Sequence, residues 1–392
     1  MKESHTFLVP DYFSHFSCKM GDCRHACCVG WPVSISMDNY FHLLGVDCTP
    51  DLRRRLDCAM YPLESPTPEA YARINHRYDG ECAARLPDGR CAIQAELGED
   101  YLADVCRLYP RGVRVEDGGA AVRCECSCAG SCEAVLEMLL RHPEPIAFVE
   151  YPMTLHMPHI PEREVQFETL GRAQAIRLFL IRTMQNRALS LPARLAHLGQ
   201  TLYMIDWVLH TRDGAALDAI LAGSVALPAL PEGKLTQSQL ADGLRIAEAM
   251  IAAFDAQSDS IREQGEAALA YFGKGEAALA RYHAANDAFA ARFPDWAIWF
   301  EHMLVNHMFF AQFPFQDRPE SIGDELVGLC AVYALLRFLA LGTQPADEAA
   351  LVDTAAACFR LIEHTDFDRT ATHMLKRIGC TRPEQLWNLI SL

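Results

Sequence analysis

Cysteine carries the clearest chemical signal in this chain. Thirteen of its sixteen cysteines lie before residue 133. Most of the thirteen fall in three clusters, which are Cys18, Cys23, Cys27 and Cys28; Cys82, Cys91 and Cys106; and Cys124, Cys126, Cys128 and Cys132. Thiolates are soft metal ligands, and a cage of four thiolates suits zinc or an iron–sulfur cluster. The clusters therefore predict a metal centre.

The spacing of the cysteines does not match the compact metal-binding loops. The chain contains no Cys-x2-Cys pair, which disfavours a zinc ribbon and a bacterial ferredoxin loop. Cys23 and Cys27 begin the spacing of radical S-adenosylmethionine (SAM) enzymes, but Cys28 follows directly and breaks it. Because adjacent side chains point in different directions, we expect Cys27 and Cys28 not to ligate the same iron. We expect one of them to ligate the metal, while the other packs in the protein or ligates a second metal centre.

Composition and charge narrow the class of protein. A hydrophobic content of 51% and a charged content of 22% are ordinary for a soluble globular protein. The N-terminus has no apolar signal-peptide core, and the apolar stretch 326–336 ends at Arg337, too short to span a bilayer. We therefore expect a cytoplasmic protein with no membrane association, whose thiols stay reduced and available for metal.

The formal net charge is −16, which argues against nucleic-acid binding because that requires a basic face. It suits a cationic partner such as an exposed lysine, or simply an acidic surface that keeps the protein soluble.

The elements that must position the cysteines divide the chain into two parts. We predict a mainly α fold, in which a cysteine-rich, loop-rich metal-binding region (1–145) packs on a multi-helix domain (160–392). Turn residues in the first part predict a small hairpin over 112–123. The proline-rich passage 152–161 is interpreted as a linker across the surface.

Apolar periodicity predicts the helices of the second part. A short helix over 132–141 is followed by helices through Ala173–Met184, after Pro192, and after the capping box Thr236-x-x-Gln239. Further helices are predicted over 258–285, 295–312, 321–341, 347–364 and 367–378.

Several sequence strings resemble a known family. FSCKMGDCRHACCVGW, CAARLPDGRCAI and CRLYPR are similar to the YkgJ-type zinc- or iron-chelating cysteine domain. The chain as a whole resembles the FliB-type flagellin lysine N-methylases, through SCEAVLEMLL, LIRTMQNRALSLPARLAHLG, LVNHMFFAQFPF and VYALLRFLALG as well. The cysteines that match the family pattern are Cys18, Cys23, Cys27, Cys28, Cys82, Cys91, Cys106 and Cys132. Cys124, Cys126 and Cys128 are additions of this chain, with no assigned role.

The resemblance implies transfer of a methyl group from SAM to lysine ε-amines of flagellin, with a [4Fe-4S] cluster. No G-x-G-x-x-G loop follows a strand pattern, so SAM must bind in some other arrangement. The cluster is then either structural or helps to bind SAM, by chelating its amino and carboxylate groups at an open iron.

Methyl transfer needs a neutral lysine, whose ordinary pKa is about 10.4. Candidate proton acceptors are the Tyr109 hydroxyl and the Glu301 carboxylate, although each also has an ordinary structural interpretation. An aromatic-rich stretch either walls a lysine channel or forms core; its members are Trp296, Trp299, Phe300, Phe309, Phe310, Phe313 and Phe315.

Two other functions remain open from the residues alone. One is a non-enzymatic iron- or zinc-binding protein, which the cysteines by themselves would support. The other is a cluster-containing oxidoreductase, although no flavin or nicotinamide fingerprint is present.

Overall fold

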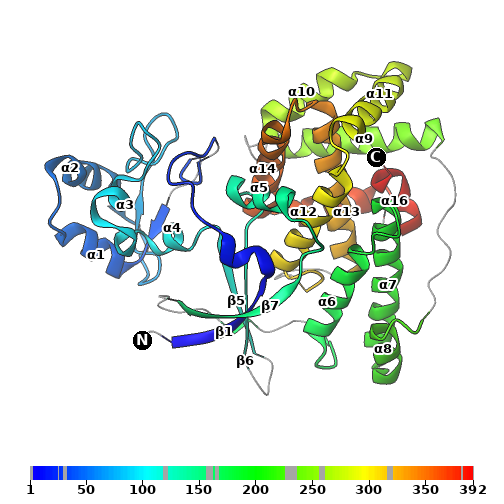
Figure 1. The fold of residues 1–392 in the computed structure, drawn as a ribbon, viewed down its shortest axis with the longest axis horizontal. Helices are drawn as coiled ribbons and strands as arrows, with labels where there is room; N and C mark the ends of the chain where they lie inside the picture. Colours follow the sequence, from blue (N-terminus) through cyan, green and yellow to red (C-terminus); the bar gives the residue numbers. More distant parts are fainter. Residues whose placement is uncertain are drawn as a thin grey trace.

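A computed structural model of the protein describes residues 3–24, 26–29, 33–117, 122–155, 162–163, 167–225, 236–255, 261–315, 321–380 and 383–391. The fold is mainly helical, as predicted. Figure 1 shows a small lobe with helices α1 to α4 beside a larger helical body, with the strands of a sheet between them. The helices of the small lobe are α1 (Met37–Gly45), α2 (Pro50–Ala59), α3 (Ala92–Leu97) and α4 (Asp104–Leu108).

A mixed five-stranded sheet joins the start of the cysteine-rich region, in β1, to its end, in β6 and β7. Its order is β7-β1-β6-β5-β8. The predicted hairpin is confirmed, because β5 and β6 pair antiparallel. The N-terminal strand β1 runs parallel to β6 and antiparallel to β7. The strands are β1 (Glu3–Pro10), β5 (Arg111–Asp117), β6 (Val122–Cys128), β7 (Phe148–Leu155) and β8 (Glu162–Arg163).

The prediction of a linker over 152–161 is wrong for its first residues. Pro152 lies in β7 and pairs with Thr6 of β1. The sheet tolerates this proline because β7 is an edge strand, where one side of the backbone needs no ladder hydrogen bond. Residues 156–161 lie outside the described part of the chain.

A smaller antiparallel sheet, in the order β2-β4-β3, lies in the small lobe. Its strands are β2 (Val33–Ile35), β3 (Met60–Pro62) and β4 (Ala72–Ile74).

Most predicted helices of the body are present at the expected places. The capping box is formed, since Thr236 Oγ1 accepts a hydrogen bond from the Gln239 amide at 3.2 Å and Gln239 Oε1 accepts one from the Thr236 amide at 2.9 Å. The predicted helices are observed as α5 (Glu133–Arg141), α6 (Ala173–Met184), α7 (Leu191–Thr211), α9 (Gln237–Asp255), α12 (Trp296–Phe310), α13 (Ile322–Gly342), α14 (Glu348–His364) and α15 (Phe367–Arg377).

The single helix predicted over 258–285 is wrong. Two helices are found there, α10 (Arg262–Phe272) and α11 (Glu276–Arg292). Gly273 and Gly275, which separate them, have φ values of 66° and 71°. Gly273 is the C-cap of α10 and Gly275 is the N-cap of α11, and glycine adopts such a positive φ without strain. The body also contains α8 (Gly214–Leu221) and α16 (Pro383–Ile390), which were not predicted.

Helix α13 runs through the centre of the body. Within the described ranges it is the one helix long and apolar enough to cross a bilayer, and it is buried throughout as a core helix. The helix continues past Arg337, so the expectation of an apolar stretch too short to span a bilayer is wrong as to length. The buried Arg337 guanidinium lies 3.9 Å from the centre of the Trp296 ring. Arg337 Nη2 also donates a hydrogen bond of 2.5 Å to Asn286 Oδ1.

Two hydrophobic cores lie on either side of the cysteine loops. The small core gathers apolar residues between Val33 and Ala103. The large core combines β1, β6 and α5 with the helices of the body. Cys124, Cys126 and Cys128 alternate along β6, so they face the same side, and all three are buried in the large core. The structure therefore places these three additional cysteines in packing.

Candidate functional site

All eight cysteines that match the family pattern line one cavity of about 130 Å³. They come from separate segments of the chain, so no single loop forms the site. Tyr109 lines the same cavity, whereas Glu301 and the three β6 cysteines do not. The eight thiols are those of Cys18, Cys23, Cys27, Cys28, Cys82, Cys91, Cys106 and Cys132.

A close approach of two glycines brings the first two cysteine clusters together. Gly21 and Gly89 have φ values of 115° and 86°, and a Cβ on Gly89 would lie 2.5 Å from the Gly21 carbonyl oxygen. The loop that carries the first cluster therefore packs, backbone against backbone, on the turn between Cys82 and Cys91. Nearby, the Cys82 amide donates a hydrogen bond of 3.0 Å to the Cys28 carbonyl.

Ion pairs hold the same loop against α5, whose N-cap residue is Cys132. Lys19 Nζ lies 2.5 Å from Glu133 Oε1 and 3.0 Å from Glu137 Oε1. Arg24 Nε lies 2.8 Å from Asp353 Oδ1 of α14. These contacts fix the first cysteine cluster beside Cys132, the cavity cysteine at the start of α5.

Burial disfavours the thiolate form of several cavity cysteines. Burial raises the pKa of the Cys23 and Cys82 thiols to about 11, and that of Cys132 to about 12. Cys28 differs, because a hydrogen bond from the Cys27 thiol and the nearby Arg85 lower its pKa. Crowded thiols with raised pKa values release their protons when a metal supplies positive charge.

The donor set therefore fits a thiophilic metal or an iron–sulfur cluster by its chemistry. Among the described residues, however, no three histidine, cysteine, aspartate or glutamate side chains lie close enough together to hold a metal ion. The thiols surround the cavity without forming a completed ligand set, and their role as ligands stays a prediction.

Tyr109 begins a polar chain that runs from the cavity into the helical body. Its hydroxyl lies 3.4 Å from Ser131 Oγ, which lies 3.4 Å from His364 Nε2. The half-buried Glu363 carboxylate accepts hydrogen bonds from the Gly130 and Ser131 amides at 2.7 and 2.9 Å. Burial raises the pKa of Glu363 to about 7. The Ser131 side chain also hydrogen-bonds Glu363. Its contacts with Tyr109 and His364 are long, as is common for catalytic hydrogen bonds before substrate binds.

Ser131, Glu363 and His364 were missed in the sequence. Glu363 and Ser131 lie 232 positions apart, and neither belongs to a motif. A local sequence pattern gives no signal for such a pair, because only the packing of α14 against α5 brings them together.

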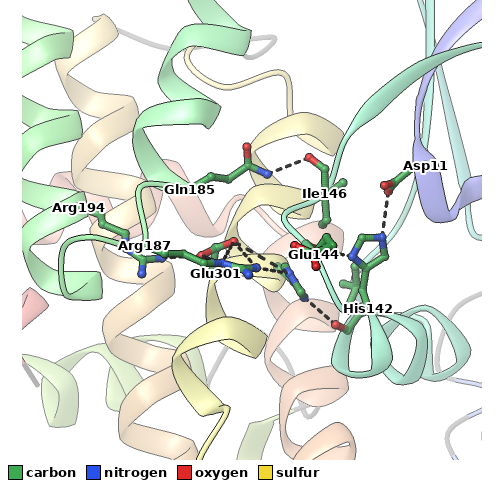
Figure 2. A network of polar contacts seen from close by, with 10 residues as sticks. Asp11, His142, Glu144, Ile146, Gln185, Arg187, Arg194 and Glu301 are labelled. Carbon is green, nitrogen blue, oxygen red and sulfur yellow. Dashed lines mark hydrogen bonds and ion pairs between the residues drawn. The ribbon is translucent and has the colours of Figure 1, made fainter.

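Glu301, the other predicted proton acceptor, is completely buried and is held by two arginines. Arg187 Nε and Nη2 each donate to its carboxylate at 3.0 Å, and Arg194 Nη1 donates at 2.6 Å (Figure 2). Both oxygens of this carboxylate are therefore engaged by guanidinium groups. The contacts thus favour the structural interpretation of Glu301.

The network around Glu301 extends toward the N-terminal segment. His302 Nδ1 donates to the Leu139 carbonyl at 2.8 Å, and its other nitrogen accepts from Arg187 at 3.1 Å. Burial lowers the pKa of His302, which agrees with this neutral form. Figure 2 also shows His142 between Asp11 and the Glu144 carbonyl, at 3.1 and 2.6 Å. The network therefore ties α12 to α5 and to the residues after β1.

The aromatic-rich stretch forms core rather than a wall of the cysteine cavity, since none of its residues lines that cavity. The buried members, all part of the large core, are Trp299, Phe300, Phe309, Phe313 and Phe315.

Comparison with known proteins identifies the helical body. A model of the FliB lysine N-methylase C-terminal domain matches residues 177–389, which is more than half of the chain. No curated protein and no solved structure matches the chain. The cysteine cavity lies before the matched segment, so its YkgJ-type resemblance stays a prediction. The chain belongs to the FliB lysine N-methylase family of protein-lysine methyltransferases.

Proposed function

We propose that this protein transfers a methyl group from SAM to lysine side chains of flagellin in the cytoplasm. The observation that carries the proposal is the family match of the helical body, residues 177–389. The non-enzymatic and oxidoreductase alternatives give no reason for that match. In the reaction, the lysine nitrogen forms a bond to the methyl carbon, the carbon–sulfur bond of SAM breaks, and the thioether leaves with the electron pair.

We also propose that the cavity thiols hold a [4Fe-4S] cluster, with ligands drawn from the eight cysteines around it. Such a cluster, when bound, joins the segments structurally or offers an iron to the amino and carboxylate groups of SAM. The thiol-rich lining supports this assignment, because four thiolates are the usual ligands of such a cluster.

The polar chain from Tyr109 supplies a route for the lysine proton. A lysine that enters the cavity gives a proton to the Tyr109 hydroxyl, which passes its own proton to Ser131 Oγ, and Ser131 passes one to the Glu363 carboxylate. The proton thereby moves from lysine to Glu363, and the free amine can attack the methyl group. Partial burial lowers the pKa of His364, which favours its neutral form beside this route.

The proposed function is tested by co-expressing the chain with flagellin in a bacterium that lacks its own flagellin methylase. Mass spectrometry of flagellin peptides is expected to show methylated lysines. Cys58→Ser is the control for replacing a cysteine outside the cavity, because Cys58 is exposed and does not line the cavity. We expect full methylation with this variant. Unmodified flagellin beside a folded, metal-loaded chain would contradict the proposal.

A further inference from the structure

We propose that His364 is the proton exit of the cavity, which takes up the proton that the substrate lysine gives to Tyr109, Ser131 and Glu363 and releases it to solvent. The inference rests on the proposed function, because that function supplies the proton. Lysine enters as an ammonium group and leaves as a methylated ammonium group, so each methyl transfer sets one proton free. Glu363 holds only one added proton, so a second turnover needs a path by which this proton leaves.

His364 lies between the buried part of the polar chain and the surface. Its Nε2 lies 3.4 Å from Ser131 Oγ, while the residue as a whole is exposed. Ser131 is only 2% exposed, and its hydroxyl lies 3.4 Å from the hydroxyl of Tyr109, which lines the cavity. His364 is thus the exposed end of the polar chain, whereas Tyr109 and Glu363 are half-buried.

The end of α14 brings two proton-binding side chains to the same serine. Glu363 and His364 are the last two residues of α14, which packs against α5, and Ser131 lies just before α5. Glu363 accepts from the Gly130 and Ser131 amides at 2.7 and 2.9 Å and hydrogen-bonds the Ser131 side chain. The Ser131 hydroxyl therefore contacts both the group that stores the proton and the group that reaches solvent.

The surroundings of His364 favour release of a proton. Partial burial and the nearby Arg360 guanidinium lower the pKa of His364, so the imidazolium form gives up its proton readily. Within the described residues, Nδ1 of His364 makes no hydrogen bond, which leaves it available to water. The ring therefore has one nitrogen toward Ser131 and another free to exchange protons with solvent.

The release step balances without any co-reactant. Protonated Glu363 gives its proton to Ser131 Oγ, and the Ser131 hydroxyl gives its own proton to His364 Nε2. This restores the carboxylate and the hydroxyl and leaves His364 as an imidazolium ion. Loss of a proton to water or buffer then returns the ring to its neutral form.

Proton release is measured directly with a pH indicator in weakly buffered solution, during turnover of the metal-loaded chain with SAM and flagellin. The pH is kept above the raised pKa of Glu363, about 7, so that this group starts as a carboxylate. Methyl transfer is followed in the same samples by mass spectrometry. For the unmodified chain we expect about one proton per methyl group, released in step with methyl transfer.

His364→Gln keeps a side chain that hydrogen-bonds Ser131 but carries no proton. We expect proton release by this variant to fall behind methyl transfer by about 10²-fold, the lower end of the contribution of a positioned proton carrier. His364→Ala should show the same delay, and imidazole added to the solution should shorten it, because the exposed position admits a small base. His210→Gln is the control, since His210 is 75% exposed on α7 and does not line the cavity.

The outcomes separate this inference from the proposed function. Proton release in step with methyl transfer in folded His364→Gln or His364→Ala would overturn the inference and leave the methyltransferase function standing. A delay in His364→Ala that imidazole does not shorten would also overturn it, because the lost ring then acts only on the structure. An unmodified chain that transfers no methyl group contradicts the proposed function instead.

Discussion

Replacing Glu301 with glutamine is expected to lower the free energy of unfolding by about 3–5 kcal/mol, the usual effect of removing one partner of a buried ion pair. The variant keeps the size of the side chain and one acceptor oxygen, but it removes the negative charge that lies 2.6 Å from the nearly buried Arg194. It also weakens the link from Arg187 to α12. Urea unfolding of the metal-loaded protein measures the change.

Glu168→Gln is the matched control for Glu301→Gln. Glu168 pairs with Arg212 at 3.7 Å on the surface, where both side chains are largely exposed. Such a pair contributes at most about 1 kcal/mol, so the control should unfold almost like the unmodified protein. Unchanged stability of Glu301→Gln together with lost methyl transfer would show instead that Glu301 is the catalytic base.

Replacing Tyr109 with phenylalanine is expected to lower kcat for methyl transfer by about 10²- to 10⁴-fold, the usual contribution of a positioned proton acceptor. The substitution removes only a hydroxyl whose hydrogen bond to Ser131 is long, so stability should change by no more than about 1 kcal/mol. Single-turnover kinetics with flagellin, at saturating SAM, measures the rate.

The pH dependence of kcat tests where the proton goes. Glu363 accepts a proton only as a carboxylate, so kcat should rise with pH through about 7, the raised pKa of this group. The groups around Glu363 are the Gly130 and Ser131 amides, the Ser131 hydroxyl, and the nearby Tyr12, Tyr109 and Cys358. In Tyr109→Phe and Ser131→Ala this rise should be lost, because the route to Glu363 is broken.

Tyr12→Phe is the control for Tyr109→Phe, because it also removes a tyrosine hydroxyl. Tyr12 also lies near Glu363, but it donates to Asn306 and does not line the cavity. Its loss should lower stability while leaving the rise of kcat through pH 7 in place. An unaltered pH profile in Tyr109→Phe would remove Tyr109 from the proton route.

The raised pKa of Glu363 also links folding to pH. A carboxyl whose pKa rises from 4.5 to about 7 on folding binds its proton more tightly in the native state. Its contribution to stability is therefore fully present below the unfolded pKa, and it is lost as pH rises toward about 7.

Local patterns predicted most of the helical body. The apolar periodicity of α6, α7 and α13 and the capping box at Thr236 are properties of neighbouring residues, so they are visible in sequence. The break between α10 and α11 was missed because GEAALAYF and GEAALARY both favour helix on their own. The strands β1 and β7 were also missed, because they pair across about 140 residues.

The candidate site was predictable to the extent that its chemistry is local. The cysteines stand out by residue type, and resemblance selected the eight that line the cavity. Their arrangement around one cavity depends on the Gly21–Gly89 contact and on α5, which bring separate segments of the chain together. The role of Glu301 was ambiguous, since nothing in its local sequence indicates that Arg187 and Arg194 neutralise it.

The most direct test of the account uses purified components. The chain is prepared anaerobically with its metal, incubated with flagellin and SAM carrying an isotopically labelled methyl group, and flagellin peptides are analysed by mass spectrometry. We expect the label on lysine ε-amines, with none transferred by the Tyr109→Phe variant within the same time. Flagellin that stays unlabelled, with a folded and metal-loaded chain, would contradict the assignment of this protein as a SAM-dependent flagellin lysine methyltransferase.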